Sequence, residues 1–135
     1  MRTFELYFYG YTWEEYAFQI SSLKGIFVIY QGCLDSEGSI DIKDLLYVGF
    51  HNGIISLYEN GIMDSLKKYV EPRNRLFLSY AEIPADVDGE KLVSILKRAV
   101  KPKFNPNSSI SDYPNTKLVN KGNCKLIPEE IFFDN

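Results

Sequence analysis

The stretch KGIFVIYQG, Lys24 to Gly32, and its counterpart DLLYVGFHNG, Asp44 to Gly53, decide the fold of this chain. Each is a short apolar run that contains a tyrosine and is bounded by glycine. Because β-branched and aromatic residues favour strands, we expect strands at 25–31 and 44–49. The segment between them, Cys33 to Lys43, is rich in Asp, Ser and Gly, which predicts a polar connection. The two strands should therefore pair as a hairpin.

The remaining chain shows both strand and helix patterns. Aromatic alternation predicts a strand at 4–9, and Thr12 is expected to cap a short helix that starts at Trp13 and ends near Ile20. Short helices are expected at 54–59 and at 65–70, the second capped by Asp64. The sequence RLFLSYAEI predicts a strand at 75–83. A longer helix is predicted at 88–100, with one apolar face made of Leu92, Ile95, Leu96 and Val100.

The end of the chain lacks a sustained period. From Phe104 onward, prolines and asparagines predict an extended tail over the body, anchored by Ile127, Ile131 and Phe132. Together these elements predict an α+β fold, with a small, mostly antiparallel central sheet flanked by helices, an extra N-terminal strand and an extended C-terminal tail. We expect a single domain, 1–135, with an N-terminal extension (1–22), a core (23–105) and a C-terminal extension (106–135).

Composition narrows the class of protein. A chain of 135 residues with 45% hydrophobic side chains is long and apolar enough to bury a core. Its two cysteines, Cys33 and Cys124, have no metal-ligand spacing and are expected to be reduced thiols. Neither a signal peptide nor a membrane-spanning run is recognisable, so we expect a cytoplasmic protein with no membrane partner.

Charge is distributed unevenly along the chain. The net charge is −3, but residues 65–103 contain nine basic and five acidic side chains. A basic segment can contact phosphates, although charged helix surfaces also serve solubility. The candidates for nucleic-acid contacts are Lys67, Lys68, Arg73, Arg75, Lys97, Arg98 and Lys101.

Three short motifs, GIF at 25–27, YVG at 47–49 and KPKFN at 101–105, follow one another in an order that resembles the GIY-YIG nucleases. Gly25-Ile26-Phe27 stands where that family has GIY, and Tyr47-Val48-Gly49 stands where it has YIG. The strand at 75–83 and a helix ending on KPKFN, residues 101–105, follow in the family's order. The resemblance covers residues 25–105, whereas the connection between the two motifs is longer than is usual in the family.

The resemblance implies four functional positions for metal-dependent phosphodiester cleavage. Motif tyrosines would serve the attacking water, an arginine would stabilise the phosphate and a glutamate would hold Mg²⁺. In this chain the first tyrosine position is Phe27, while Tyr47 matches the second. The arginine position, about eight residues after Gly49, is Leu57, and the glutamate position is Val93. Three of the four implied polar groups are therefore replaced.

Two nearby residues offer substitutes. Glu90 precedes Val93 by one helical turn and lies on the same helix face, so it is the fallback metal ligand. His51, the one histidine, follows the second motif and is a fallback base. The alternative for Glu90 is a surface residue in the first turn of the helix, where the helix dipole favours a negative charge. The alternative for His51 is an ordinary polar loop residue.

The motif residues also have a structural explanation. Gly25 and Gly49 fit strand ends where backbones approach closely, and Tyr30 and Tyr47 fit cross-strand packing partners. We therefore expect a catalytically degenerate module that binds a protein or nucleic acid and needs no cofactor. The alternative is a rearranged Mg²⁺-dependent endonuclease that uses Tyr47, His51 and Glu90. An accidental likeness with an unrelated function is a third possibility, and the aromatic N-terminal strand makes a homodimer a further expectation.

Overall fold

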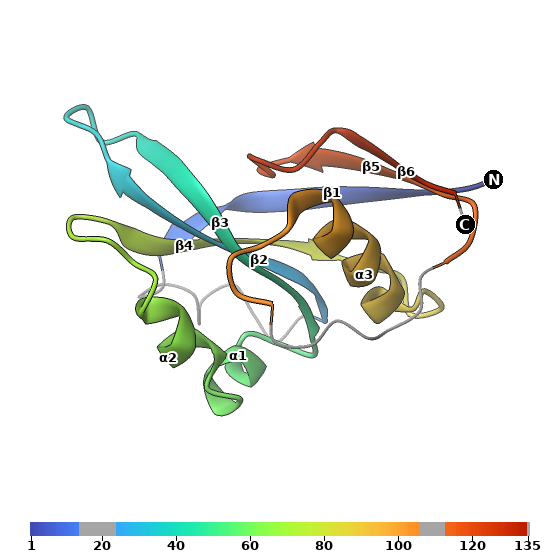
Figure 1. Ribbon diagram of the computed structural model, residues 1–135, viewed down its shortest axis with the longest axis horizontal. Helices are drawn as coiled ribbons and strands as arrows, with labels where there is room; N and C mark the ends of the chain where they lie inside the picture. The colour runs from blue at the N-terminus through green and yellow to red at the C-terminus, as the bar shows by residue number, and fades with distance from the viewer. Residues whose placement is uncertain (14–23, 106–112, 135) are drawn as a thin grey trace.

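The computed structural model describes residues 1–13, 24–105 and 113–134 (Figure 1). Its centre is a six-stranded sheet in the order β3-β2-β4-β1-β5-β6. The strands are β1 (Arg2–Trp13), β2 (Gly25–Leu34), β3 (Ile40–His51), β4 (Arg75–Glu82), β5 (Thr116–Gly122) and β6 (Glu130–Phe133). The helices within the described residues are α1 (Ile55–Glu59), α2 (Ile62–Lys67) and α3 (Gly89–Val100). All neighbouring strands are antiparallel except β1 and β5, which confirms the α+β class and the mostly antiparallel sheet.

Strand β2 lies inside the sheet and is buried along most of its length. It pairs with β3 on one side and with β4 on the other, and its residues from Gly25 to Gly32 are buried. Gly25 fits this position because a Cβ there would overlap the carbonyl group of Ala81 on β4. An apolar run of this kind is expected where both faces of a sheet are covered.

Alternate side chains of β2 enter two hydrophobic clusters. Ile26 and Val28 belong to the cluster that contains Leu92 and Leu96 of α3. Phe27 and Ile29 belong to the cluster that contains Leu57 of α1 and Leu66 of α2. Because successive strand residues point to opposite faces, α3 lies on one face of β2 and the α1–α2 pair on the other. The helical face predicted for Leu92 and Leu96 is confirmed, since neither side chain is exposed.

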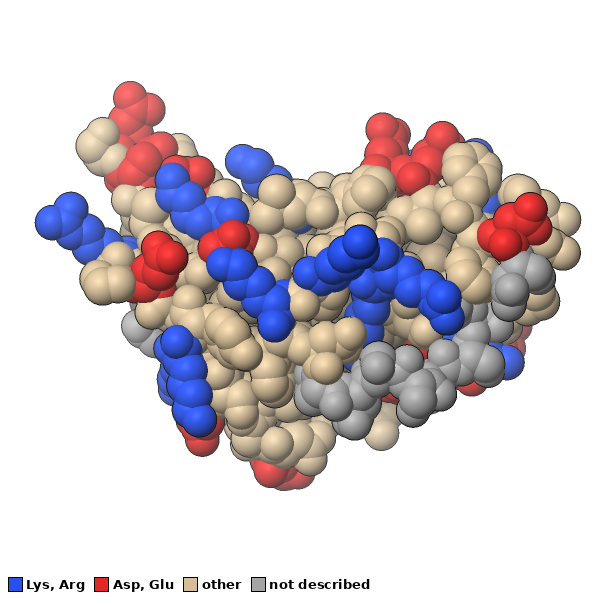
Figure 2. All heavy atoms as spheres, viewed as in Figure 1, with Lys and Arg blue, Asp and Glu red and all other residues tan. Residues whose placement is uncertain are grey.

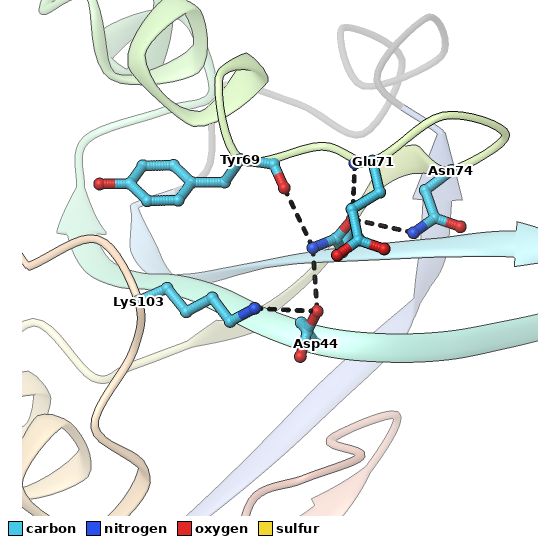
Figure 3. A network of polar contacts seen from close by, with 6 residues as sticks. Asp44, Tyr69, Glu71, Asn74 and Lys103 are labelled. Carbon is cyan, nitrogen blue, oxygen red and sulfur yellow. Dashed lines mark hydrogen bonds and ion pairs between the residues drawn. The ribbon is translucent and has the colours of Figure 1, made fainter.

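A buried amide ties the segment after α2 to the sheet (Figure 3). Gln31 of β2 is fully buried, and its Nε2 donates to Asp44 Oδ2 at 2.9 Å and to the Tyr69 carbonyl at 3.1 Å. Its Oε1 accepts from the Glu71 backbone N–H at 3.1 Å and from Asn74 Nδ2 at 2.9 Å. All four hydrogen-bonding positions of the amide are thus used. Lys103 Nζ completes the network at 3.2 Å from Asp44.

Several predicted boundaries at the start of the chain are wrong. The first strand continues to Trp13, which pairs with Phe77, so the predicted helix does not begin at Trp13. The rest of that helix, 14–20, lies outside the described residues. The predicted polar connection shrinks to 35–39, where Asp35 Oδ1 accepts from the backbone N–H groups of Glu37 and Ser39, both at 2.9 Å. Strand pairing extends to residues whose polarity alone suggested a loop.

The predictions for α2 and for the tail are also partly wrong. Helix α2 begins after Gly61, whose φ of 71° is left-handed, rather than at an Asp64 cap. The tail contains two strands, because β5 pairs in parallel with β1 and in turn with β6. Of the predicted anchors, Ile127 is buried and Ile131 packs against the core, whereas Phe132 is 60% exposed. Within the described residues, none of the helices has the length and hydropathy that a membrane span requires.

Replacement of Leu96 tests the packing of α3. Leu96→Ala should lower the free energy of unfolding by about 2–5 kcal/mol, because it leaves a cavity in a closed core. Ala99→Ser, at an exposed position of the same helix, should change it by less than about 0.5 kcal/mol. Urea denaturation of both variants measures the difference. Equal stability of the two variants would mean that α3 presents a different face to the sheet.

Candidate functional site

A pocket opens at the edge of the sheet, beside strand β3. Its volume is about 300 Å³, and it lies between β3, the α1–α2 segment and α3. It is lined by Tyr47, Gly49, Phe50, His51, Asn60, Ile62, Ser65, Glu90, Val93, Lys97 and Phe104. The pocket therefore brings Tyr47, His51 and Glu90 together, from three separate places in the sequence.

Three alternate residues of strand β3 form the floor of the pocket, because every second side chain of a strand points to the same face. Tyr47, Gly49 and His51 are alternate residues of β3, so they share one face of the sheet. A Cβ at Gly49 would overlap the Tyr47 phenol. The absent side chain of Gly49 thus leaves the space in which the Tyr47 ring extends toward His51.

A chain of hydrogen bonds runs through His51. Tyr47 Oη lies 2.8 Å from His51 Nε2, and His51 Nδ1 lies 2.8 Å from Ser56 Oγ on α1. Asn60 Nδ2 donates to the same Ser56 oxygen at 3.3 Å. A neutral imidazole has one N–H, so either Tyr47 donates and Ser56 accepts, or Ser56 donates and Tyr47 accepts. Only in the second arrangement is the Tyr47 O–H left for a ligand.

Burial determines the protonation states of Tyr47 and His51 in these hydrogen bonds. Burial, followed by the positive charge of Lys97, lowers the pKa of His51 to about 4, so the ring is neutral at neutral pH. Burial, followed by the charge of Glu90, raises the pKa of Tyr47 above its ordinary value. At neutral pH the pair is thus an uncharged hydrogen-bonding unit, and Tyr47 is a poor base.

Helix α3 supplies the opposite wall with two charges. Glu90, Val93 and Lys97 follow one another at spacings of three and four, and all line the pocket, as their shared helix face predicts. Burial raises the pKa of Glu90, and the nearby positive charge of Lys97 only partly offsets this. Burial also lowers the pKa of Lys97, against the effect of Glu90. The pocket therefore offers a ligand two charged groups of its own, the carboxylate of Glu90 and the ammonium of Lys97.

The motif positions lie at or beneath this pocket. Phe27 is 2% exposed, and its ring lies 6.1 Å from the His51 ring and 6.0 Å from the Tyr80 ring. Leu57 is fully buried in the cluster under α1 and α2, so the position aligned with an arginine faces the core. Val93 forms part of the pocket wall and is 3% exposed. Only Tyr47 presents a polar group among these four positions.

A divalent cation finds few ligands here. Within residues 1–13, 24–105 and 113–134, no group of three or more His, Cys, Asp and Glu side chains is arranged to hold a metal. Among the described residues, Glu90 is the one carboxylate in the pocket lining. Mg²⁺ takes octahedral oxygen coordination, usually from one or two carboxylates, waters and substrate phosphates. A metal at Glu90 would depend almost wholly on water and ligand oxygens.

The basic candidates are spread over several elements. Lys67 ends α2 and Lys68 caps it. Arg73 precedes β4, which begins at Arg75. Lys97 and Arg98 lie in the last turn of α3, and Lys101 caps that helix. Figure 2 shows Lys and Arg side chains gathered over α3, with isolated ones elsewhere on that face. Lys97 turns into the pocket, and Arg98 Cζ lies 5.2 Å from the Phe133 ring centroid. The end of α3 is thus the basic part nearest to the pocket.

Two sequence interpretations are corrected by this geometry. Tyr30 and Tyr47 are not packing partners, because they belong to different clusters on opposite faces of the sheet. His51 is not a loop residue but the last residue of β3, and it is 8% exposed. Part of the signal was present in the sequence, since Tyr47 and Gly49 are spaced two apart in the predicted strand 44–49 and His51 continues that spacing beyond its predicted end. Ser56, Asn60 and Phe104 had no such signal.

Phe104 lines the pocket and packs against the hydrophobic cluster under α1 and α2. Its backbone N–H donates to the Leu46 carbonyl of β3 at 2.9 Å, which places the segment after α3 along the edge of the sheet. Its ring lies 6.2 Å from the Tyr47 ring and 6.1 Å from the Tyr69 ring. Tyr69 in turn belongs to the segment that Gln31 holds. The Gln31 network thus supports one wall of the pocket.

Comparison with known proteins leaves the family of this chain open. No family model, no curated protein and no solved structure matches it.

Substitution of Gly49 tests the geometry of the floor. Gly49→Ala should displace the Tyr47 ring, break its bond to His51 and raise the pKa of His51 toward 6.5, because the ring becomes hydrated. The protein has one histidine, so an NMR titration of the ring proton follows His51 directly. Gly10→Ala is the control, since a Cβ there would meet Asn123 Oδ1 at 3.8 Å, an ordinary van der Waals contact. An unchanged His51 pKa in Gly49→Ala would refute this geometry.

The stability of the protein should depend on the charge state of His51. The pKa of His51 is about 4 in the folded protein and about 6.5 in the unfolded chain. Between these two pH values the unfolded state binds more protons than the folded state. The contribution of neutral His51 to the free energy of unfolding is therefore complete above pH 6.5 and is lost as the pH falls to 4. The loss is on the order of 3 kcal/mol.

Urea denaturation between pH 4 and pH 7 measures this contribution in the wild type and in His51→Gln. Carboxylates titrate in both proteins, so the difference between the two curves isolates the histidine. We expect the wild type to lose more stability than the variant on acidification. Parallel curves would show that His51 titrates normally in the folded protein.

Proposed function

We propose that this chain is a catalytically degenerate GIY-YIG-like module that binds a protein or a nucleic acid at the pocket beside β3 and over the end of α3. In this proposal residues 23–105 form the scaffold, and the two extensions, 1–22 and 106–135, enlarge its sheet into a single domain. The proposed location is the cytoplasm. The module needs no cofactor to bind its partner.

The burial of Leu57 carries the proposal. This side chain is fully buried and packs with Phe27 and Leu66 in the core. An arginine placed there would bury a guanidinium group in an apolar cluster, at a cost of several kcal/mol. The position that would stabilise a phosphate in a nuclease therefore serves packing in this chain. Phe27 and Val93 support the same conclusion, because neither offers a polar atom to a water or a metal.

The retained polar groups suit recognition. Tyr47 and His51 form an uncharged pair, while Glu90 and Lys97 add one charge of each sign on the facing wall. Such a set fixes the orientation of a bound group through a few convergent polar contacts. The basic side chains at the end of α3 extend the contact surface beyond the pocket (Figure 2).

The convergence of Tyr47, His51 and Glu90 favours one rival, a rearranged Mg²⁺-dependent endonuclease. All three residues line the same pocket. The pKa of His51, about 4, makes it a weak base at neutral pH. Of the lining residues that the structure describes, Glu90 alone offers a carboxylate to a metal and Lys97 alone offers a positive charge to the phosphate. The rival therefore requires three functions from groups that fit each of them poorly.

A cleavage assay separates the two proposals. Purified protein incubated with plasmid DNA, single-stranded DNA and RNA in the presence of Mg²⁺ or Mn²⁺ should show no cleavage above background. Hydrolysis lacks an effective base, a charge at the Leu57 position and a metal site, and each such loss typically costs about a hundredfold or more in rate.

Matched variants decide the origin of any activity. The rival predicts metal-dependent cleavage that disappears in both His51→Ala and Glu90→Ala, and that result would overturn the proposal. Cleavage unaffected by either change would indicate a contaminating nuclease. Fluorescence anisotropy with the same nucleic acids then identifies the partner. Binding that weakens at least about tenfold in Arg98→Gln/Lys101→Gln indicates phosphate contacts at α3, whereas no binding indicates a protein partner.

A further inference from the structure

The second half of the sheet has one face that the described helices do not cover. Along β1, Phe4, Leu6 and Phe8 point into the core beside α3. The alternate residues Tyr7 and Tyr9 point the other way and are 57% and 49% exposed. We call this side of β1, β5 and β6 the outer face. It belongs to the terminal extensions and lies apart from the pocket at β3, which is at the opposite edge of the sheet.

Aromatic rings are concentrated on the outer face. The Tyr7 and Tyr9 ring centroids are 5.3 Å apart, and the Tyr9 ring lies 5.5 Å from that of Tyr80 on β4. Across the face, Phe132 of β6 is 60% exposed and lies beside Lys117, its register partner on β5. Phe132 lies nearer the start of β1, because its partner Lys117 pairs with Thr3. Exposed rings gathered on one sheet face of a monomer mark an interaction surface, since singly scattered apolar residues are the usual pattern.

The charges of the outer face are balanced and paired. Lys121 Nζ lies 3.0 Å from Glu5 Oε1, and Lys117 Nζ lies 2.8 Å from Glu130 Oε2. These two lysines and two glutamates cancel. A nucleic acid requires cations that are free to neutralise phosphates, so this face suits it poorly despite its rings. A strongly acidic or basic protein would find no matching net charge here.

We propose that the outer face binds a second copy of this chain in a two-fold symmetric dimer. A copy presents the same set of rings and the same balanced charges, so rings meet rings and each lysine finds a carboxylate on either chain. Face-to-face packing of two sheets is a common way to cover such a surface. The strand registers place nine residues on this face: Thr3, Glu5, Tyr7, Tyr9, Lys117, Val119, Lys121, Glu130 and Phe132. This is fewer than the roughly 20–30 residues per side of a standard interface, so the dimer is weak, with a micromolar dissociation constant.

Sedimentation equilibrium of the full chain tests this dimer between about 1 and 500 µM, a range that brackets a weak association. The wild type should shift from monomer to dimer with rising concentration. Tyr7→Ser/Phe132→Ser should weaken the association at least about tenfold through loss of the ring contacts. Lys121→Glu should also weaken it, because both copies of the face then carry excess negative charge. Ile55→Ser, on α1 at a residue that is 53% exposed, is the control and should dimerise like the wild type.

The outcomes divide clearly. All four changes are at exposed positions, so circular dichroism should show folded proteins, and a failure of one variant leaves the others informative. A wild type that stays monomeric throughout would overturn the dimer. A dimer equally sensitive to Ile55→Ser, or insensitive to the variants of the outer face, would place the interface elsewhere. Anisotropy with labelled single-stranded RNA and DNA covers the competing partner, and tight binding lost in Tyr7→Ser/Phe132→Ser would also overturn the proposal.

Discussion

The pairing of β2 with β3 and β4 is the interaction on which the rest of the structure depends. Both faces of β2 are covered, so its alternate residues join α3 to one cluster and the α1–α2 pair to the other. The same pairing sets Phe27 opposite Gly49 and so brings the two motif strands into one register. Gln31 then uses its buried amide to fix the segment after α2 against this hairpin. The pocket exists because β3 forms the edge of the sheet, where helices from both faces can reach past it.

The chemistry of the pocket follows from the spacing of three residues on that edge. Gly49 gives the Tyr47 ring room to reach His51, and the buried imidazole stays neutral. Under the proposed likeness to the GIY-YIG nucleases, a site that held phosphate and metal would need polar or charged groups at the positions of Leu57 and Val93, and both are apolar and buried. The hydrogen-bonding floor and the two charges on α3 therefore support the proposal that the pocket binds a group and does not cleave a bond. Scaffold and activity are separable in this way in many folds.

Much of the central hairpin could be predicted from sequence, because its strands are rich in β-branched and aromatic residues. Helix α3 could be predicted as well, because its apolar residues recur at helical spacing. The strand β5 could not, since two of its three inward positions, Thr116 and Asn120, are polar and hide the alternation. Thr116 Oγ1 donates to the Tyr113 and Pro114 carbonyls, and Asn120 Nδ2 donates to the Pro128 carbonyl, contacts that only the folded chain shows. For the site, sequence reasoning found Tyr47, His51 and Glu90 but not the bond between the first two. That bond depends on the missing side chain of Gly49 as much as on its partners.

Paramagnetic broadening by Mn²⁺ tests most directly the claim that the pocket binds without a metal. In a ¹H–¹⁵N NMR spectrum, a manganese ion held at the pocket would broaden the amide signals of Glu90, Val93 and Lys97 before others. Our account predicts no selective broadening of these signals at about one equivalent of Mn²⁺, because a lone carboxylate holds the ion weakly. Selective broadening that saturates near one equivalent and disappears in Glu90→Gln would contradict it.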